Sequence, residues 1–156
     1  FHPQSFIQEK DMIKRFEEKY SKLSNFSFDT NADNIPSMIK ADIMISDFSG
    51  IIHEFAYLFD KPVVYSIEGY STEIYDADFL DEPTWRFKTL HKIGKEIKRE
   101  NVNDIVQILE DLKTNSKKEE IEELKKISCQ YEGQSAKRTV DFLVQKQKEV
   151  SENGNS

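Results

Sequence analysis

The feature that most constrains the fold is an apolar run at residues 42–46, followed by a polar turn at 47–50, a helix-compatible stretch at 51–59 and a second apolar run at 62–65. The two apolar runs have the composition of buried parallel strands. The stretch between them is too long for a hairpin loop, so strand, helix, strand is the economical arrangement. The sequence therefore predicts a right-handed βαβ unit in a Rossmann-like, three-layer α/β domain with a parallel sheet.

The N-terminal part of the chain predicts a helix, a short strand and a helical turn. Apolar residues recur at three- and four-residue spacing between Met12 and Tyr20, which predicts a helix near 8–22. Residues 25–29 alternate polar and apolar side chains before a polar loop, so we expect a short strand there. Pro36 is expected to open a short helical turn.

The C-terminal part predicts three amphipathic helices. Apolar positions from 102 to 112 indicate one helix, with Asn103 as its N-cap and Asn115 as its end. Apolar positions in 121–127 and in 136–143 indicate two more. We expect these last helices to pack back on the sheet.

Length and composition are those of one domain. The 156 residues are 37% hydrophobic, which is enough to fill one core. We expect a single domain over residues 1–150 and a disordered polar tail at 151–156. The first residue is Phe1, with no strand or cap before it, so we expect an N-terminally truncated fragment.

Charge and cysteine content exclude several classes of function. The net charge of -7 repels polyanions and argues against nucleic-acid binding. The single cysteine, Cys129, cannot form an intrachain disulfide and, with three histidines, leaves no plausible zinc cluster, so no metal or cofactor is expected. No apolar run approaches the ~20 residues that cross a bilayer. A cytoplasmic location fits best.

The turn at 47–50 is the strongest candidate for a binding site. Where a parallel strand ends and a helix begins, free amide groups and the helix dipole favour an anion. Ser49 could donate its hydroxyl to a phosphate, and Gly50 would let the phosphate approach the backbone. Glu54, one turn further along, could reach a ribose hydroxyl. A pyrophosphate group is the natural ligand.

Each of these residues also has an ordinary structural explanation. Ser49 could be an N-cap worth ~1 kcal/mol, and Gly50 could tolerate a tight turn. Asp47 could be a simple turn residue, and Glu54 an exposed helical side chain. From the pattern alone, the structural explanation of Ser49 is slightly favoured.

The histidines and a local group of basic residues are weaker candidates. His2, in a His-Pro pair, could face the same crevice and donate to a diphosphate or act as acid or base, although a lone loop histidine is more often idle. His53 and His91 have no such context.

A basic cluster could meet an anionic acceptor or a membrane surface, or be simply solvated; its members are Arg86, Lys88, Lys92, Lys95, Lys98 and Arg99. Trp85 and Phe87 beside it indicate a strand or loop with inward aromatics.

Several segments resemble the CDP-glycerol glycerophosphotransferase family, the teichoic-acid polymerases and primases. The matching segments are 1–7 (FHPQSFI), 40–50 (KADIMISDFSG), 55–56 (FA), 61–65 (KPVVY), 85–87 (WRF), 93–94 (IG) and 133–138 (GQSAKR). The resemblance covers most of the chain, and its most specific segments lie in the first half.

The resemblance implies the C-terminal, nucleotide-binding half of a two-domain GT-B transferase that is inactive without its N-terminal domain. It implies that His2 serves catalysis or diphosphate binding, that Asp47, Ser49 and Gly50 contact phosphate, and that Glu54 is the usual acidic residue of the next helix. The implied donor is CDP-glycerol, the acceptor a polyol phosphate or glycan, and the location the cytoplasm, with peripheral contact at the inner face of the bacterial membrane as an option.

The sequence departs from that family in two places. Gly50 replaces a second serine, and the region from Glu68 to Trp85 lacks an Asp-x-x-x-Tyr pattern in clear register. Two alternatives therefore stay open. One is a nucleotide-sugar-dependent glycosyltransferase or epimerase-like domain, and the other is a non-catalytic remnant that acts as an interaction module.

Overall fold

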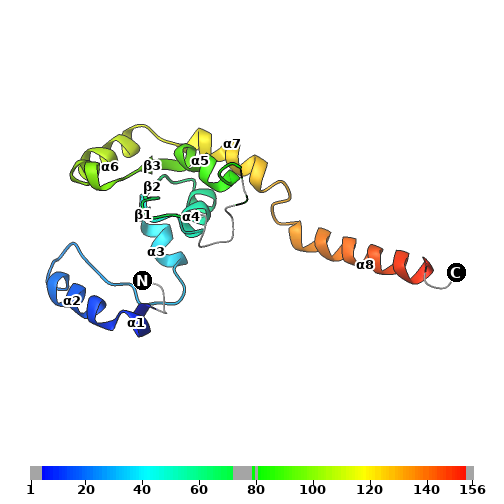
Figure 1. The fold of residues 1–156 in the computed structure, drawn as a ribbon, viewed down its shortest axis with the longest axis horizontal. Coiled ribbons are helices and arrows are strands. Elements are labelled where there is room, and N and C mark those ends of the chain that lie inside the picture. The colour runs from blue at the N-terminus through cyan, green and yellow to red at the C-terminus, as the bar shows by residue number, and fades with distance from the viewer. Residues whose placement is uncertain (1–4, 72–78, 80, 154–156) are drawn as a thin grey trace.

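The sheet at the centre of the protein is parallel and has three strands. The computed structural model describes residues 5–71, 79 and 81–153, and Figure 1 shows their arrangement. The strands β1 (Met44–Ser46), β2 (Val63–Tyr65) and β3 (Gly94–Glu96) lie in the order β1-β2-β3. The fold is α/β and is compatible with the Rossmann-like architecture that the sequence predicts.

The predicted strand-helix-strand unit is present. Helix α4 (Ile51–Phe59) connects β1 to β2, and these strands pair in parallel with Met44 opposite Val63. The helix forms because Ile52, Phe55 and Ala56 give it one apolar face, and all three are buried. It ends at Asp60, which adopts a left-handed conformation with φ of 52°.

The pairing of β2 with β3 depends on a glycine. Helix α5 (Trp85–Ile93) runs directly into β3, where Gly94 lies opposite Val63. A Cβ atom on Gly94 would lie 1.9 Å from the carbonyl oxygen of Val63, so a side chain does not fit. The close approach of the two backbones requires glycine here.

Helices cover both faces of the sheet. Val63 and Tyr65 point toward α3 (Ile35–Lys40), α4, α5 and α7 (Lys118–Ser128), whose buried side chains form the larger core. Val64 points the other way and packs against α6 (Ile105–Thr114). These are the three layers that the sequence predicts.

Strand β1 is less buried than the pattern predicts. Ile45 lies opposite Val64 in register, on the face that α6 covers, yet its side chain is 58% exposed. On this face, α6 mainly covers Val64, which packs against Ile108 and Leu112 of that helix. The prediction of a parallel strand is thus confirmed, and the prediction of full burial is wrong.

The N-terminal helices lie apart from the sheet in Figure 1. The short α1 (Ser5–Gln8) is followed by α2 (Lys10–Tyr20), which confirms the predicted helix, and α3 carries Pro36 in its first turn as expected. The strand predicted at 25–29 is absent, because Phe26 and Phe28 have no neighbouring strand there and their rings instead pack edge to face, with Phe26 also against Tyr20.

Residues 85–87 are helical, so the predicted strand or loop is wrong. They form the first turn of α5, with Thr84 at the N-cap position. Phe87 packs against the larger core, whereas Trp85 is 42% exposed. Three residues that alternate between aromatic and basic fit one helical turn as well as a strand. The packing of Phe87 against the core favours the helix over the strand.

Helix α6 is confirmed with a different start. A 3-10 helix, η2 (Arg99–Asp104), precedes it, so Asn103 lies inside η2 and is not the N-cap. The Asn101 side chain instead accepts the Lys98 backbone N–H and closes the start of η2. Asn115 ends α6, as predicted.

The two C-terminal helices behave differently. Ile121 and Leu124 of α7 are buried in the larger core, so α7 packs on the sheet as predicted. Helix α8 (Ser135–Asn153) projects away from the sheet in Figure 1, and Val140 and Leu143 on it are 57% and 59% exposed. The prediction that it packs back is wrong, because the other helices already cover the faces of the sheet. No helix in the described part of the chain is both long and apolar enough to cross a membrane.

Candidate functional site

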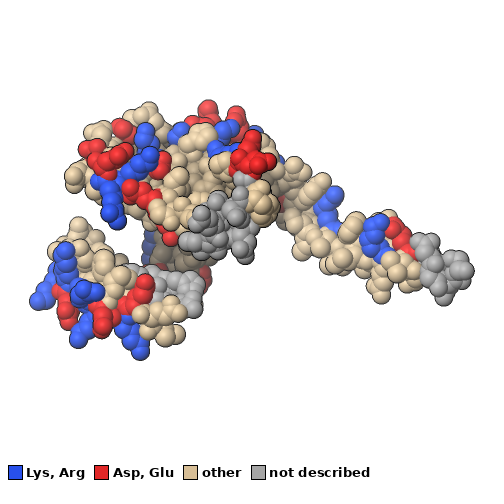
Figure 2. Space-filling model, in the orientation of Figure 1, with Lys and Arg blue, Asp and Glu red and all other residues tan. Residues whose placement is uncertain are grey.

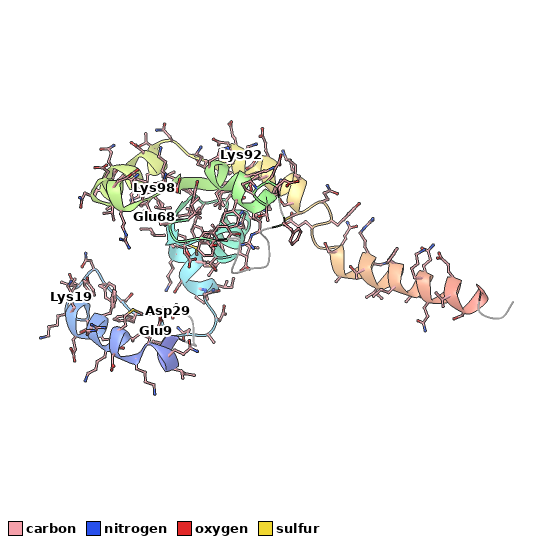
Figure 3. The ribbon with its side chains drawn as sticks, viewed as in Figure 1. Glu9, Lys19, Asp29, Glu68, Lys92 and Lys98 are labelled. Atoms are coloured by element: carbon pink, nitrogen blue, oxygen red, sulfur yellow. The ribbon has the colours of Figure 1, made fainter. Side chains whose placement is uncertain are left out.

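The carboxyl ends of the three strands and the N-terminal ends of α4 and α5 meet at one edge of the sheet. In parallel α/β sheets this edge is where ligands bind, since loops open there and helix dipoles point toward it. Figure 3 shows Glu68 and Lys98 near each other, on the loops that follow β2 and β3. The Glu68 carboxylate accepts the backbone N–H of Arg99 at 3.1 Å, which joins these two loops.

The turn between β1 and α4 is shaped by Asp47. Its Oδ1 atom accepts the backbone N–H of Ser49 at 2.8 Å, an Asx-type turn. This carboxylate therefore stabilises the turn, and the backbone N–H of Ser49 is already hydrogen-bonded and is not available to a ligand. Gly50, rather than Ser49, takes the cap position, and no side chain caps α4. Among the described residues the Ser49 hydroxyl has no hydrogen-bond partner.

Two backbone amides at the turn are available to a ligand. The N–H groups of Ile52 and His53 donate to the carbonyls of Ser49 and Gly50, at 3.3 and 3.1 Å. Within the described chain, the N–H groups of Gly50 and Ile51 have no acceptor. Together with the Ser49 hydroxyl they form a set of donors at the positive end of the helix dipole. Such a set can bind an anion.

Arg86 adds a positive charge to the turn. It lies in the first turn of α5, and its Nη2 atom is 3.3 Å from where a Cβ on Gly50 would be. Among the residues that the structure describes, no carboxylate forms an ion pair with Arg86. The glycine therefore makes room for a guanidinium group, which is the side chain best suited to bind phosphate in a bidentate manner.

The rest of the basic cluster does not form one surface with Arg86. Lys88 pairs with Glu82, and Lys98 lies 3.8 Å from Glu96. Figure 2 shows Lys and Arg intermixed with Asp and Glu over the visible face. Of the six clustered residues, Arg86 is the one that the structure places at the turn. From sequence, Arg86 was identified only as a member of the basic cluster. No local pattern indicates where α5 begins relative to α4, so the approach of Arg86 to the turn could not be predicted.

His53 lies beside Arg86 and was given no role from sequence. Its side chain is 8% exposed, and neither ring nitrogen has a hydrogen-bond partner among the described residues. Burial lowers the pKa of His53 below its usual 6.5, and the positive charge of Arg86 lowers it further. At neutral pH the imidazole is therefore uncharged. His91, in the last turn of α5, is exposed.

The carboxylate of Glu54, a residue predicted for the site, makes no hydrogen bond or ion pair with the turn within the described chain. Glu54 lies in the first turn of α4, where a negative charge interacts favourably with the helix dipole. This is an adequate structural reason for an acidic residue at this position. His2 lies outside the described residues, so its predicted role stays a prediction.

An aromatic pocket adjoins the turn. Phe48, between Asp47 and Ser49, has its ring centroid 5.0 Å from that of Tyr70 and 6.2 Å from that of Phe87, and the last two rings are 4.2 Å apart. A mostly apolar cavity of about 400 Å³ lies against Tyr70 and Phe87, and its lining is Ile67, Tyr70, Asp81, Glu82, Pro83, Thr84, Phe87 and Lys88. Its volume is that of a small-molecule site. We call it the aromatic pocket.

The chemistry of the neighbouring titratable groups is limited. Burial raises the pKa of Tyr65 to about 12, and the carboxylate of Glu96 raises it as well, so this hydroxyl keeps its proton at neutral pH. No group of three or more His, Cys, Asp or Glu side chains in the described chain could hold a metal ion. The described part of this edge therefore offers hydrogen-bond donors, one guanidinium group and an apolar pocket.

Comparison with known proteins identifies no relative of this chain. No family model matches it, and neither a curated protein nor a solved structure does. The geometry at the carboxyl edge and the sequence resemblance are therefore the two indications of what the chain binds.

Proposed function

We propose that this domain binds the diphosphate of a nucleotide-diphosphate donor at the turn between β1 and α4. The proposed protein is the nucleotide-binding part of a CDP-glycerol:polyol-phosphate glycerophosphotransferase, which makes a teichoic-acid-like or capsular cell-surface polymer. The general step, diphosphate binding, is supported by the geometry of the turn. The choice of donor and reaction is supported by the sequence resemblance.

The observation that carries the proposal is the set of unoccupied donors around Gly50. The hydroxyl of Ser49 and the amides of Gly50 and Ile51 lie at the start of α4, and Arg86 approaches the same point from α5. A diphosphate carries enough acceptor oxygens to engage the amides and the guanidinium group together. The mostly apolar aromatic pocket next to the turn fits the remainder of a nucleotide.

In the proposed reaction, an acceptor hydroxyl attacks the β-phosphorus of CDP-glycerol. A new P–O bond forms to the acceptor, the bond from the β-phosphorus to the bridging oxygen breaks, and CMP leaves with that oxygen. The proton of the acceptor hydroxyl passes to solvent. Arg86 and the amides at the α4 N-terminus would stabilise the negative charge that grows on the leaving phosphate. The role proposed for His2 follows from the resemblance.

Two other functions use the same site differently. In a nucleotide-sugar enzyme, the acceptor would attack the sugar carbon of the donor, and the whole nucleoside diphosphate would leave. A non-catalytic remnant would retain the fold without turnover. In a protein that carries the proposed N-terminal domain as well, release of CMP from CDP-glycerol with a polyol-phosphate acceptor separates the proposed function from both.

Binding to the 156-residue chain tests the diphosphate site directly. Isothermal titration calorimetry with CDP is expected to show binding in the unmodified chain, and Ser49→Ala and Arg86→Gln should each weaken it roughly tenfold, since each removes a hydrogen bond to a charged group. Neither change should lower the melting temperature appreciably, because neither side chain makes a hydrogen bond or ion pair within the described chain.

Arg15 supplies a matched control. It is an exposed arginine on α2, away from the sheet, and its side chain donates to the Asp11 carbonyl within the same helix. Arg15→Gln changes the net charge by the same amount as Arg86→Gln and should leave CDP binding unchanged. Absence of CDP binding, or an equal loss in both arginine variants, would show that the turn is not a diphosphate site.

A further inference from the structure

We infer that His53 is a positioning residue of the proposed diphosphate site: it lies against the first turn of α5, which carries Arg86, and it takes up a proton from solvent when an anion binds to Arg86. This inference rests on the proposed function, because the anion is the diphosphate at the turn. It adds to the site a buried group that the ligand need not contact, since the effect passes through the charge of Arg86.

The side chain of His53 is buried without a hydrogen-bond partner. It is 8% exposed, and neither Nδ1 nor Nε2 has a partner among the described residues. A buried polar group left unpaired costs about 1–3 kcal/mol, and folded proteins rarely contain one. The neighbouring Ile52, Phe55 and Ala56 on α4 are apolar and fully buried, so an apolar side chain at position 53 would avoid this cost. The imidazole is therefore a candidate for a functional group.

His53 connects the turn with the start of α5. Its backbone N–H donates to the Gly50 carbonyl at 3.1 Å, and Nη2 of Arg86 approaches the same glycine. The backbone carbonyl of Arg86 faces the imidazole and favours its protonated form, although the two do not form a hydrogen bond of normal geometry. A change in the charge of the imidazole therefore acts directly on the residue that would hold the phosphate.

The charge of Arg86 helps to keep the imidazole neutral in the free protein. Burial lowers the pKa of His53, and the guanidinium group of Arg86 lowers it further. A diphosphate bound to Arg86 would offset the guanidinium charge and would so raise the pKa of His53. The protonated ring then donates to the Arg86 carbonyl, which stabilises the first turn of α5 in its position beside the turn.

The other groups around His53 do not account for such a change. On α4, the ring centroid of Tyr57 lies 5.9 Å from that of His53. Burial raises the pKa of Tyr57, so its hydroxyl keeps its proton at neutral pH, and it lies 3.3 Å from the hydroxyl of Ser128 on α7. Within the described chain, α3, β1, β2 and α7 pack against α4 without placing a charged side chain where it shifts the pKa of His53. Arg86 is therefore the group through which a ligand acts.

Calorimetry with CDP at about pH 8 and about pH 5.5, on either side of the ordinary histidine pKa, measures the coupling. CDP itself gains a proton in this range, so the unmodified chain is compared with His53→Gln, for which the titration of the free ligand is the same. The ratio of the two affinities should be roughly fivefold larger at the lower pH in favour of the unmodified chain, which is the low end of coupling between sites. The unmodified chain should also take up more protons per bound CDP, measured as a stronger dependence of the binding enthalpy on the buffer.

Nuclear magnetic resonance follows the ring of His53 directly and requires no substitution. Inorganic sulfate keeps both its charges over this pH range, and it is added until the amide signal of Gly50 no longer moves. It should shift the titration curve of His53 to higher pH and leave the curve of His91, exposed in the last turn of α5, in place. In Arg86→Gln without ligand, the His53 curve should already lie at higher pH, because the charge that lowers its pKa is absent.

His91→Gln is the matched control, because it removes an exposed histidine from the same helix and should leave CDP binding unchanged at both pH values. If CDP and sulfate fail to bind at either pH, the diphosphate site is wrong and this inference falls with it. If they bind but the affinity ratio does not change with pH, or the His53 curve does not move, the diphosphate site stands and the role of His53 is overturned. If circular dichroism shows that His53→Gln is unfolded, the titration of the unmodified chain decides alone.

Discussion

Replacing Gly94 with alanine is the sharpest test of how the sheet is built. The added methyl group would lie 1.9 Å from the carbonyl oxygen of Val63 and 2.7 Å from its Cγ2 atom. Gly94 has an extended backbone, with φ of -176°, so alanine suffers no conformational strain there. The whole effect of the substitution therefore comes from the collision between β3 and β2.

The size of the effect can be worked from these distances. A Cβ atom essentially never approaches another heavy atom more closely than 3.0 Å, so the two backbones must separate by about 1 Å. Neighbouring strands are normally about 4.8 Å apart. An added displacement of about 1 Å stretches the hydrogen bonds between the strands past their useful range. Loss of two or three of them, at about 1 kcal/mol each, predicts a decrease of about 3 kcal/mol in the free energy of unfolding. For a chain of this length the melting temperature should fall by about 6–12 °C.

Urea unfolding followed by circular dichroism measures the decrease, and Gly50→Ala is the matched control. A methyl group on Gly50 would lie 3.3 Å from Nη2 of Arg86, which is the far end of a flexible side chain and can move. Gly50 has φ of -57°, which alanine adopts readily. We expect this variant to change the free energy of unfolding by less than about 1 kcal/mol.

Equal stability of the two variants would refute this reasoning. If Gly94→Ala unfolds within 1 kcal/mol of the unmodified chain, as estimated for the control, then β3 does not approach β2 as closely as described, and the register of Gly94 opposite Val63 is wrong. A lower m-value together with a lower midpoint would indicate partial loss of β3 before the rest unfolds.

Three further predictions address other contacts. Because the folded chain holds His53 neutral while an unfolded histidine titrates near 6.5, the free energy of unfolding should fall as pH decreases from about 7 to 5, and urea unfolding of His53→Phe should show a smaller fall; an equal fall would remove His53 as its source. Lys61 donates from Nζ to the carbonyls of Ile39 and Ala41 at 2.8 and 2.6 Å, so Lys61→Met should lower stability by about 1–2 kcal/mol in the same assay, and no change would show that water replaces these bonds. A chain ending at Gln134 lacks α8 and should keep the free energy of unfolding within about 0.5 kcal/mol, whereas a large loss would place α8 on the core.

Local pattern is sufficient to predict the centre of the fold. The runs at 42–46 and 62–65 could be identified as parallel strands because β-branched and apolar residues are bounded by polar turns, and the intervening helix has its apolar face at 52, 55 and 56. The turn at 47–50 could likewise be placed at the carboxyl end of a strand. These features depend on neighbours within about ten residues along the chain.

Features that depend on distant neighbours could not be predicted in this way. The approach of Arg86 to Gly50 joins positions that are far apart in sequence, and nothing near either residue indicates it. The rings of Phe48, Tyr70 and Phe87 come together from three separate segments. The strand expected at 25–29 failed for the same reason, because alternation predicts a strand only where another strand offers its edge.

The position of α8 shows the limit of amphipathic patterns. Val140 and Leu143 have helical spacing, so a helix was predicted correctly, but the spacing does not say what covers the apolar side. A helix packs on the sheet only where the other helices leave space for it. In this chain α7 already occupies that space, with Ile121 and Leu124 in the larger core.

The exposure of Ile45 has a consequence for how this chain behaves at high concentration. Among the described strands, β1 pairs with β2 and with no other, so its second edge presents unpaired amide and carbonyl groups beside an exposed isoleucine. Such an edge is a template for intermolecular strand pairing and aggregation, and three residues of strand keep the template short. A lysine or glutamate in place of Ile45 would act as a gatekeeper there, raising solubility while leaving the buried face of β1 unchanged.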